Sequence, residues 1–228
     1  IPFLIPFLFA MSIGPKLKWI KSDLKNKLNL IIFFLISLLI SFLIIKNFDT
    51  NILINTILVT SAFYLFFITV KDFLIKEAQN LSQKLAHFGF SLLILSILLN
   101  SIFSTEIITN LKVGEKFESE KTKINFVSLE TKEINNYKAV IGKFIIENLN
   151  GDSEILEPEL RIYNQPNIVT SEADIKTNLF TDKFITINLV QNQNYFNVRY
   201  QIKPFMIWIW ISVLLISFSG LIGILKKK

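Results

Sequence analysis

Cysteine is absent from this 228-residue chain, and histidine occurs once, at His87. The lack of cysteine excludes disulfides, thiolate metal sites and a cysteine nucleophile. The sequence contains no P-loop, GxSxG, HExxH or CxxC motif, so the residues needed for NTPase, hydrolase and thiol-redox chemistry are missing. Chemistry that requires several imidazole or thiolate ligands is therefore not available to this chain by itself.

Glycine and proline are also scarce, with 7 and 6 residues, whereas 51% of the chain is hydrophobic and phenylalanine occurs 22 times. The mean hydropathy is +0.49, and the apolar residues are bunched into long runs, which indicates a membrane protein. A helix that crosses a bilayer needs about 20 such residues. The runs predict a partial span over residues 1–13, full spans over 28–45, 52–70 and 85–103, and a final span over 204–225.

The net charge of +6 is unevenly distributed along the chain. Basic residues outnumber acidic ones in the loops 14–27 and 71–84 and in the tail 226–228, whereas acidic residues are slightly in excess over 104–203. This pattern places the basic loops on the cytoplasmic or mitochondrial matrix side, with Trp19, Trp208 and Trp210 as interfacial anchors. Because the positive-inside pattern accounts for the excess of basic residues, the net charge is not evidence for a nucleic-acid partner.

Residues 104–203 form a different kind of sequence, without a long apolar run. Apolar and polar residues alternate there, as in strands with one buried face. Strands are predicted over 123–129, 139–147, 154–163, 184–190 and 195–202, and Asn150-Gly151 is a strong hairpin signal. The predicted fold class is a multi-pass α-helical membrane protein with a small extracytoplasmic antiparallel β domain.

His87 stands where the apolar run 85–103 begins, followed by Gly89. An ionisable group at the mouth of a membrane helix is costly to desolvate and is a functional candidate by default. Imidazole is a common metal ligand and can hold haem iron axially, but an interfacial ring lying among lipid headgroups is the simpler interpretation of the pattern. Gly89 either lets another helix or a flat macrocycle approach closely, or provides ordinary small-residue packing.

Four groups of residues in order resemble the CcmF family, the haem lyase subunit of cytochrome c maturation, and its NrfE and CcsA-like relatives. The groups are Ile13-Gly14-Pro15 with Trp19; Ala86-His87-Phe88-Gly89; Glu159, Arg161 and Tyr163 followed by Ser171-Glu172-Ala173-Asp174-Ile175 and Asp182; and Val198-Arg199-Tyr200 with Lys203-Pro204-Phe205 and Trp208-Ile209-Trp210. The resemblance covers nearly the whole chain and identifies it with the C-terminal portion of the family.

The resemblance implies that His87 is one axial ligand of the iron of a haem b within the membrane. It implies a subunit of the complex that attaches haem covalently to apocytochrome c, with no catalytic residue in this chain. The implied partners are the remainder of CcmF or a separately encoded N-terminal half, other haem ligation subunits, a haem chaperone, apocytochrome c and membrane lipid. The implied location is the bacterial or mitochondrial inner membrane, with the β domain in the periplasm or intermembrane space.

The chain also departs from the family. It lacks the tryptophan-rich WWD segment and the further histidines that precede this region in the family, so the second haem ligand is expected from outside the chain. Lys183-Phe184 stands where the family usually has Leu-Tyr. The chain opens on Ile1 without an initiator methionine or signal peptide, and we expect it to be a natural split subunit or a fragment of a longer protein.

Other polar residues admit simpler interpretations. Glu157, Glu159 and Asp174 are a conceivable acid-base group, but a solvated β surface is favoured. Arg161, Arg199 and Lys203 are either surface charges, which is favoured, or partners for a haem propionate or an apocytochrome, because guanidinium groups pair with carboxylates. The alternative function is a non-enzymatic membrane scaffold whose β domain binds an apocytochrome or an assembly partner, with His87 purely structural.

Overall fold

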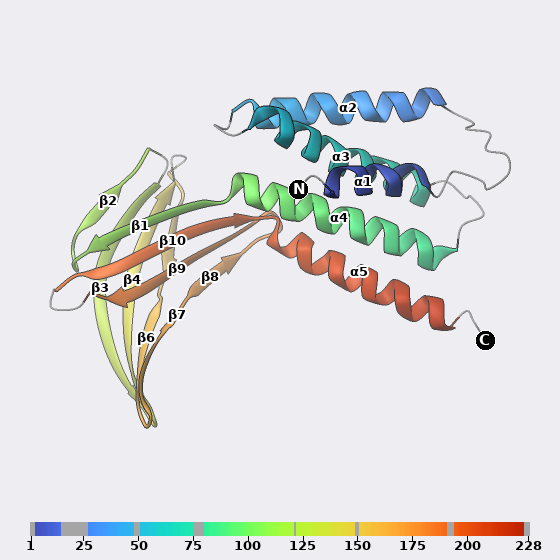
Figure 1. The fold of residues 1–228 in the computed structure, drawn as a ribbon. Helices are drawn as coiled ribbons and strands as arrows, with labels where there is room; N and C mark the ends of the chain where they lie inside the picture. The colour runs from blue at the N-terminus through green and yellow to red at the C-terminus, as the bar shows by residue number, and fades with distance from the viewer. Residues whose placement is uncertain are drawn as a thin grey trace. The chain divides into compact units, whose positions relative to one another are not determined.

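The computed structural model describes residues 3–14, 27–47, 51–74, 80–120, 122–148, 151–190 and 194–225. The chain divides into a helical unit, Ile1–Ile102 with Met206–Lys228, and a β unit, Phe103–Phe205 (Figure 1). The predicted fold class, a multi-pass helical membrane protein with an antiparallel β domain, is confirmed.

The helical unit contains α1 (Leu4–Ile13), α2 (Lys27–Ile45), α3 (Ile52–Leu74), α4 (Leu81–Phe103) and α5 (Met206–Leu225). By length and composition, four of these helices are able to cross a membrane: Leu28–Ile45, Ile52–Leu74, Leu81–Phe103 and Met206–Leu225. Helix α3 continues past the predicted end at residue 70 and α4 begins before residue 85. Lys71 is tolerated inside α3 because its long side chain places the ammonium 5.9 Å from the centre of the Phe33 ring.

Serine and threonine side chains hold the helices in two ways. Within α3, the hydroxyls of Thr60 and Ser61 donate to carbonyls of the same helix at 2.6 and 2.7 Å. Between helices, Thr69 Oγ1 lies 2.7 Å from Ser91 Oγ, and Ser82 Oγ donates to the carbonyl of Ser219 at 2.7 Å. These bonds join α3 to α4 and α4 to α5 in an apolar setting.

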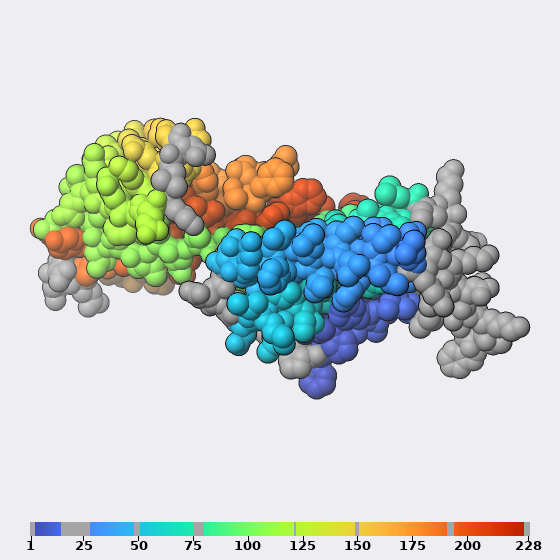
Figure 2. Space-filling view, turned by 90° about the horizontal axis from the view of Figure 1, so that it is seen from above, coloured from blue at the N-terminus to red at the C-terminus, as the bar shows by residue number. Residues whose placement is uncertain are grey.

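The outer surface of the helical unit is strongly apolar. In Figure 2, α2 lies across the near face of the helices in blue. Its large side chains Ile31, Leu35, Leu39 and Phe42 are exposed. An exposed face of this size is incompatible with water and fits lipid or further membrane helices.

The β unit is a sandwich of two antiparallel sheets with strand orders β1-β10-β9-β8 and β2-β3-β4-β6-β7, and β5 also pairs with β4. The strands are β1 (Thr105–Leu111), β2 (Lys116–Glu118), β3 (Thr122–Ile134), β4 (Tyr137–Asn148), β5 (Ser153–Leu156), β6 (Glu159–Asn164), β7 (Asn167–Glu172), β8 (Asp174–Thr177), β9 (Thr181–Leu189) and β10 (Phe196–Pro204). The predicted strand over 154–163 is two strands, β5 and β6. Pro158, which lies between them, has no N–H to donate to a ladder.

Alternating residues of both sheets fill the core of the sandwich. The rings of Phe126 and Phe144 stack at 4.3 Å, and Phe196 meets Phe126 edge-on at 5.6 Å. A Cβ at Gly142 would lie 2.8 Å from Phe144 Cε2, so only glycine allows β4 to pass beside these rings. The core lies wholly between the sheets, which leaves the outward faces for polar contacts.

Candidate functional site

His87 lies in the second turn of α4, and its side chain is half-buried. Phe90 and Ser91 share its helix face. The Phe90 ring packs edge-on against Phe7 of α1 at 6.2 Å, and Ser91 bonds to Thr69 of α3. The imidazole therefore lies on the side of α4 that faces α1 and α3.

Aromatic side chains surround this part of α4. The ring of Phe88 lies 6.0 Å from that of Phe66 and 5.8 Å from that of Phe73, both on α3. Within the described ranges, no hydrogen bond or ion pair engages the His87 imidazole. An imidazole without such a partner is able to bind a metal ion through a ring nitrogen.

Gly89 is on the opposite side of α4, where α5 packs. A Cβ at Gly89 would lie 2.9 Å from Ile216 Cγ1 and 3.2 Å from the carbonyl oxygen of Ser212. Of the alternatives for this glycine, the structure favours close approach of a helix: α5 occupies the space that a side chain would need.

The described residues contain no group of three or more His, Asp or Glu side chains that could hold a metal ion. His87 is thus a single candidate ligand, and a six-coordinate iron would need its other protein ligand from elsewhere.

The carboxylates considered from the sequence do not form an acid-base pair. Asp174 Oδ2 accepts the backbone N–H of Glu157 at 2.6 Å, which ties β8 to the segment between β5 and β6. Glu159 instead pairs with Arg161 at 3.1 Å, and the Arg161 guanidinium lies over the Tyr137 ring at 5.2 Å. The bond to Glu159 raises the pKa of Arg161. These residues act as structural surface contacts.

Arg199 on β10 and Glu106 on β1 form a second charged contact. Arg199 Nε and Gln201 Nε2 both donate to Glu106 Oε1. These two bonds hold the pKa of Glu106 below its usual value, and the positive charges of Arg199 and Lys203 add to the effect. The Arg199 guanidinium is therefore paired with Glu106 of the neighbouring strand β1.

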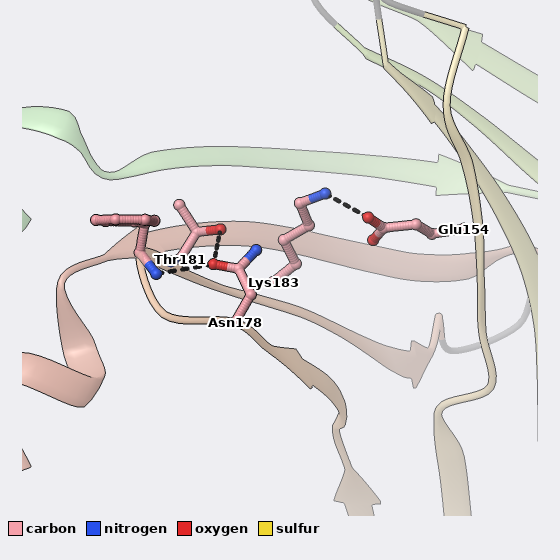
Figure 3. A network of polar contacts seen from close by, with 5 residues as sticks. Glu154, Asn178, Thr181 and Lys183 are labelled. Atoms are coloured by element: carbon pink, nitrogen blue, oxygen red, sulfur yellow. Dashed lines mark hydrogen bonds and ion pairs between the residues drawn. The ribbon is translucent and has the colours of Figure 1, made fainter.

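Lys183 forms an ion pair that sequence reasoning missed. Its Nζ lies 2.6 Å from Oε1 of Glu154 on the opposite sheet (Figure 3), and the two side chains are only 14% and 28% exposed. Lys183, Thr105, Thr122, Asn148 and other residues line a cavity of about 710 Å³ at this end of the sandwich. The sequence did contain a signal for this ion pair. Lys183 is two residues before the buried Ile185 on an alternating strand, so both side chains lie on the same, inward face.

Some sequence expectations lie outside the described residues. They are Pro15, Trp19 and the lysines around them, Asn150, and the tail 226–228. Trp208 and Trp210 are in the first turn and a half of α5, and Trp210 is exposed.

The helices and the sandwich together define an integral membrane protein with an antiparallel β-sandwich domain. Residues 102–204 match the family described as the CcmF C-terminal beta-sandwich. The sequence is 21% identical over 234 residues to cytochrome c-type biogenesis protein CcmF of Escherichia coli K12, covering 99% of this chain and 36% of that protein. It is 29% identical over 143 residues to cytochrome c-type biogenesis protein ccl1 of Rhodobacter capsulatus, covering 63% of this chain and 22% of that protein.

The fold agrees with these relatives. A solved structure named cytochrome c heme lyase CcmF superimposes with a TM-score of 0.70 at 16% identity, over 96% of this chain and 38% of that one. Nearly the whole chain is thus similar to CcmF, and residues 102–204 match the C-terminal β-sandwich of that family. It spans roughly a third of the length of the E. coli relative.

Proposed function

We propose that this chain is the C-terminal part of a membrane haem lyase complex that attaches haem covalently to apocytochrome c, and that His87 supplies one axial ligand of a haem b. The observation that carries the proposal is the position of the chain's one imidazole, half-buried in the second turn of α4, in a chain similar along nearly its whole length to CcmF.

The residues around His87 fit this role. The imidazole has no hydrogen-bond partner among the described residues, and the neighbouring Phe88 packs against Phe66 and Phe73 of α3. Helix α4 is held from two sides, by Thr69 through Ser91 and by α5 through Gly89, which fixes the direction of the imidazole. A bound haem would supply one-electron chemistry, and the hydrophobic surroundings would exclude water from it.

The second ligand, the haem-handling surface and the ligation chemistry belong to the part of CcmF outside this chain. The sandwich would lie in the periplasm or intermembrane space, next to apocytochrome c or a haem chaperone. Two of its arginines are already paired with carboxylates of the sandwich, Arg199 with Glu106 and Arg161 with Glu159. This pairing supports a positioning role rather than a catalytic one.

The test is a reduced-minus-oxidised optical spectrum of the chain co-expressed with the preceding part of CcmF. We expect a b-type spectrum that His87→Gly abolishes and that added imidazole restores, because the free ligand can occupy the vacated position. Gln83→Ala is the matched control, since Gln83 is exposed and one turn earlier on the same helix face. Its spectrum should equal that of the unmodified pair.

A b-type spectrum that survives His87→Gly would remove the ligand role. If that variant also still supported cytochrome c maturation, the scaffold alternative would replace it, with the sandwich as the binding element.

A further inference from the structure

The turn between β8 and β9 exposes two large apolar side chains next to each other. Leu179 and Phe180 are 62% and 61% exposed. Two adjacent side chains of this size at the tip of a tight turn are unfavourable in water, because their burial would remove a large apolar area from it. What covers Leu179 and Phe180 is indicated by the position of the turn beside the start of α5.

Hydrogen bonds within the turn hold its backbone in one conformation. Asn178 Oδ1 accepts the N–H of Phe180 at 2.9 Å, the N–H of Thr181 at 2.7 Å and the Thr181 hydroxyl at 3.1 Å (Figure 3). The Asn178 N–H donates to the carbonyl of Thr181 at 2.9 Å. The backbone of the apolar pair is thus fixed before any partner arrives, which reduces the entropy cost of binding.

This turn is bonded to the residue that precedes the last membrane helix. The Phe205 N–H donates to the carbonyl of Phe180 at 2.7 Å, and Phe205 directly precedes the first residue of α5, Met206. Helix α5 has 20 residues, which at 1.5 Å per residue is about 30 Å long, the thickness of the hydrocarbon layer. The start of α5, and with it Phe180, therefore coincides with the edge of that layer.

We propose that residues 178–181 form a membrane-surface anchor, in which Leu179 and Phe180 insert among the lipids of the leaflet where α5 begins. The partner is the lipid bilayer itself. The side chains of Asn178 and Thr181 satisfy the polar groups of the turn internally, as an inserted loop requires. The exposed Lys176 on β8, next to the turn, is available for lipid phosphates. This anchor does not depend on the role of His87.

The anchor has a structural consequence for the sandwich. Besides its two covalent connections to helices, the β unit gains a third attachment at the bilayer surface, on the strand pair β8 and β9. A third point of contact restricts tilting about the two chain connections.

The absence of cysteine allows a direct test with single labels. Phe180→Cys and, separately, Leu179→Cys in the full chain would each carry a nitrobenzoxadiazole fluorophore, in vesicles of phosphatidylcholine and phosphatidylglycerol. The control is Leu189→Cys, which is 53% exposed at the other end of β9, about 26 Å away at 3.3 Å per residue. Leu189 pairs with Phe196, whereas Thr181 pairs with Pro204 beside α5.

We expect blue-shifted emission at both turn positions and several-fold stronger quenching by phosphatidylcholine with brominated acyl chains than at Leu189. Water-like emission at positions 179 and 180, equal to that at 189, would overturn the proposal. Blue-shifted emission that brominated lipid does not quench would also overturn it, because the turn would then be covered by protein.

Discussion

Lys183 Nζ lies 2.6 Å from Glu154 Oε1 and so joins the two sheets of the sandwich. Lys183 is on β9 of the four-stranded sheet, and Glu154 is on β5 of the other. Glu154 Oε2 is buried and has no hydrogen-bond partner among the described residues. The ion pair with Lys183 is therefore the main interaction that offsets the cost of burying the Glu154 carboxylate.

We expect Lys183→Ala to destabilise the sandwich by about 3 kcal/mol, because it leaves a largely buried carboxylate unpaired. The double variant Lys183→Leu with Glu154→Leu should recover most or all of the stability, since it removes both charges. Hydrogen exchange of the β5 and β9 amides, in the full chain in lipid nanodiscs, measures the opening free energy.

Lys123→Ala is the control for this prediction. Lys123 pairs with Glu118 at 3.0 Å, but both side chains are more than half exposed, so its loss should cost less than about 1 kcal/mol. Equal losses for Lys183→Ala and Lys123→Ala would show that the inter-sheet pair has no special energetic weight.

The Lys183 pair also illustrates the limit of prediction from sequence. The alternation of residues 184–190 predicts a strand with one buried face, and β9 confirms this strand. The same alternation does not reveal that Lys183 points inward to Glu154, because the carboxylate is 29 positions away and on another sheet. A contact of this kind depends on how two sheets stack, which local periodicity does not encode.

The sequence did not predict strands β1, β2, β7 and β8. Strands β2 and β8 have only three and four residues, too few for an alternating pattern to be recognised. Strand β7 shows exposed or half-buried residues throughout, so it lacks a clear apolar face. Long, apolar segments such as α3 and α4 were predictable because membrane helices require them.

Tyr200→Phe should leave the sandwich equally stable or stabilise it at neutral pH. The Tyr200 side chain is buried, and its hydroxyl has no hydrogen-bond partner among the described residues. An unsatisfied buried hydroxyl costs about 1–3 kcal/mol, which phenylalanine does not incur. Urea unfolding followed by the far-ultraviolet circular dichroism of the sheet compares the two proteins.

The unmodified chain and Tyr200→Phe should also differ in their stability at alkaline pH. Burial, with a contribution from Glu154, raises the pKa of Tyr200 from 10.0 to about 12. Because the folded pKa is raised, the contribution of the neutral phenol is fully present below pH 10 and is lost as the pH rises towards 12. The unmodified chain should lose stability in this interval relative to Tyr200→Phe; parallel curves would contradict the assignment.

Acid should weaken the edge formed by β1 and β10. Hydrogen bonds from Arg199 and Gln201 lower the pKa of Glu106 below 4.5, so its contribution is present above that pH and is lost as the pH falls through the lowered value. Hydrogen exchange of the β1 amides should accelerate in this acidic range. Glu106→Gln should show faster exchange already at neutral pH and a smaller change on acidification.

The packing of α5 against Gly89 of α4 is expected to be sensitive to one methyl group. A Cβ at Gly89 would lie 2.9 Å from Ile216 Cγ1, 3.2 Å from Leu215 Cβ and 3.2 Å from the Ser212 carbonyl oxygen, whereas nothing lies within 4 Å of a Cβ at Gly220. Gly89→Ala should therefore push the helices apart at a cost of about 1–3 kcal/mol. Gly220→Ala, on the same helix pair, should be neutral.

An engineered disulfide reports this separation directly. A Cβ built at Gly223 lies 3.8 Å from the Cβ of Ser82, which is the mean Cβ separation across a disulfide. Ser82→Cys with Gly223→Cys should oxidise readily in the otherwise cysteine-free chain. Adding Gly89→Ala should lower the yield on a non-reducing gel, and adding Gly220→Ala should not. Equal yields would mean that α4 and α5 accommodate the methyl group without separating, and that Gly89 does not set the position of α4 and His87.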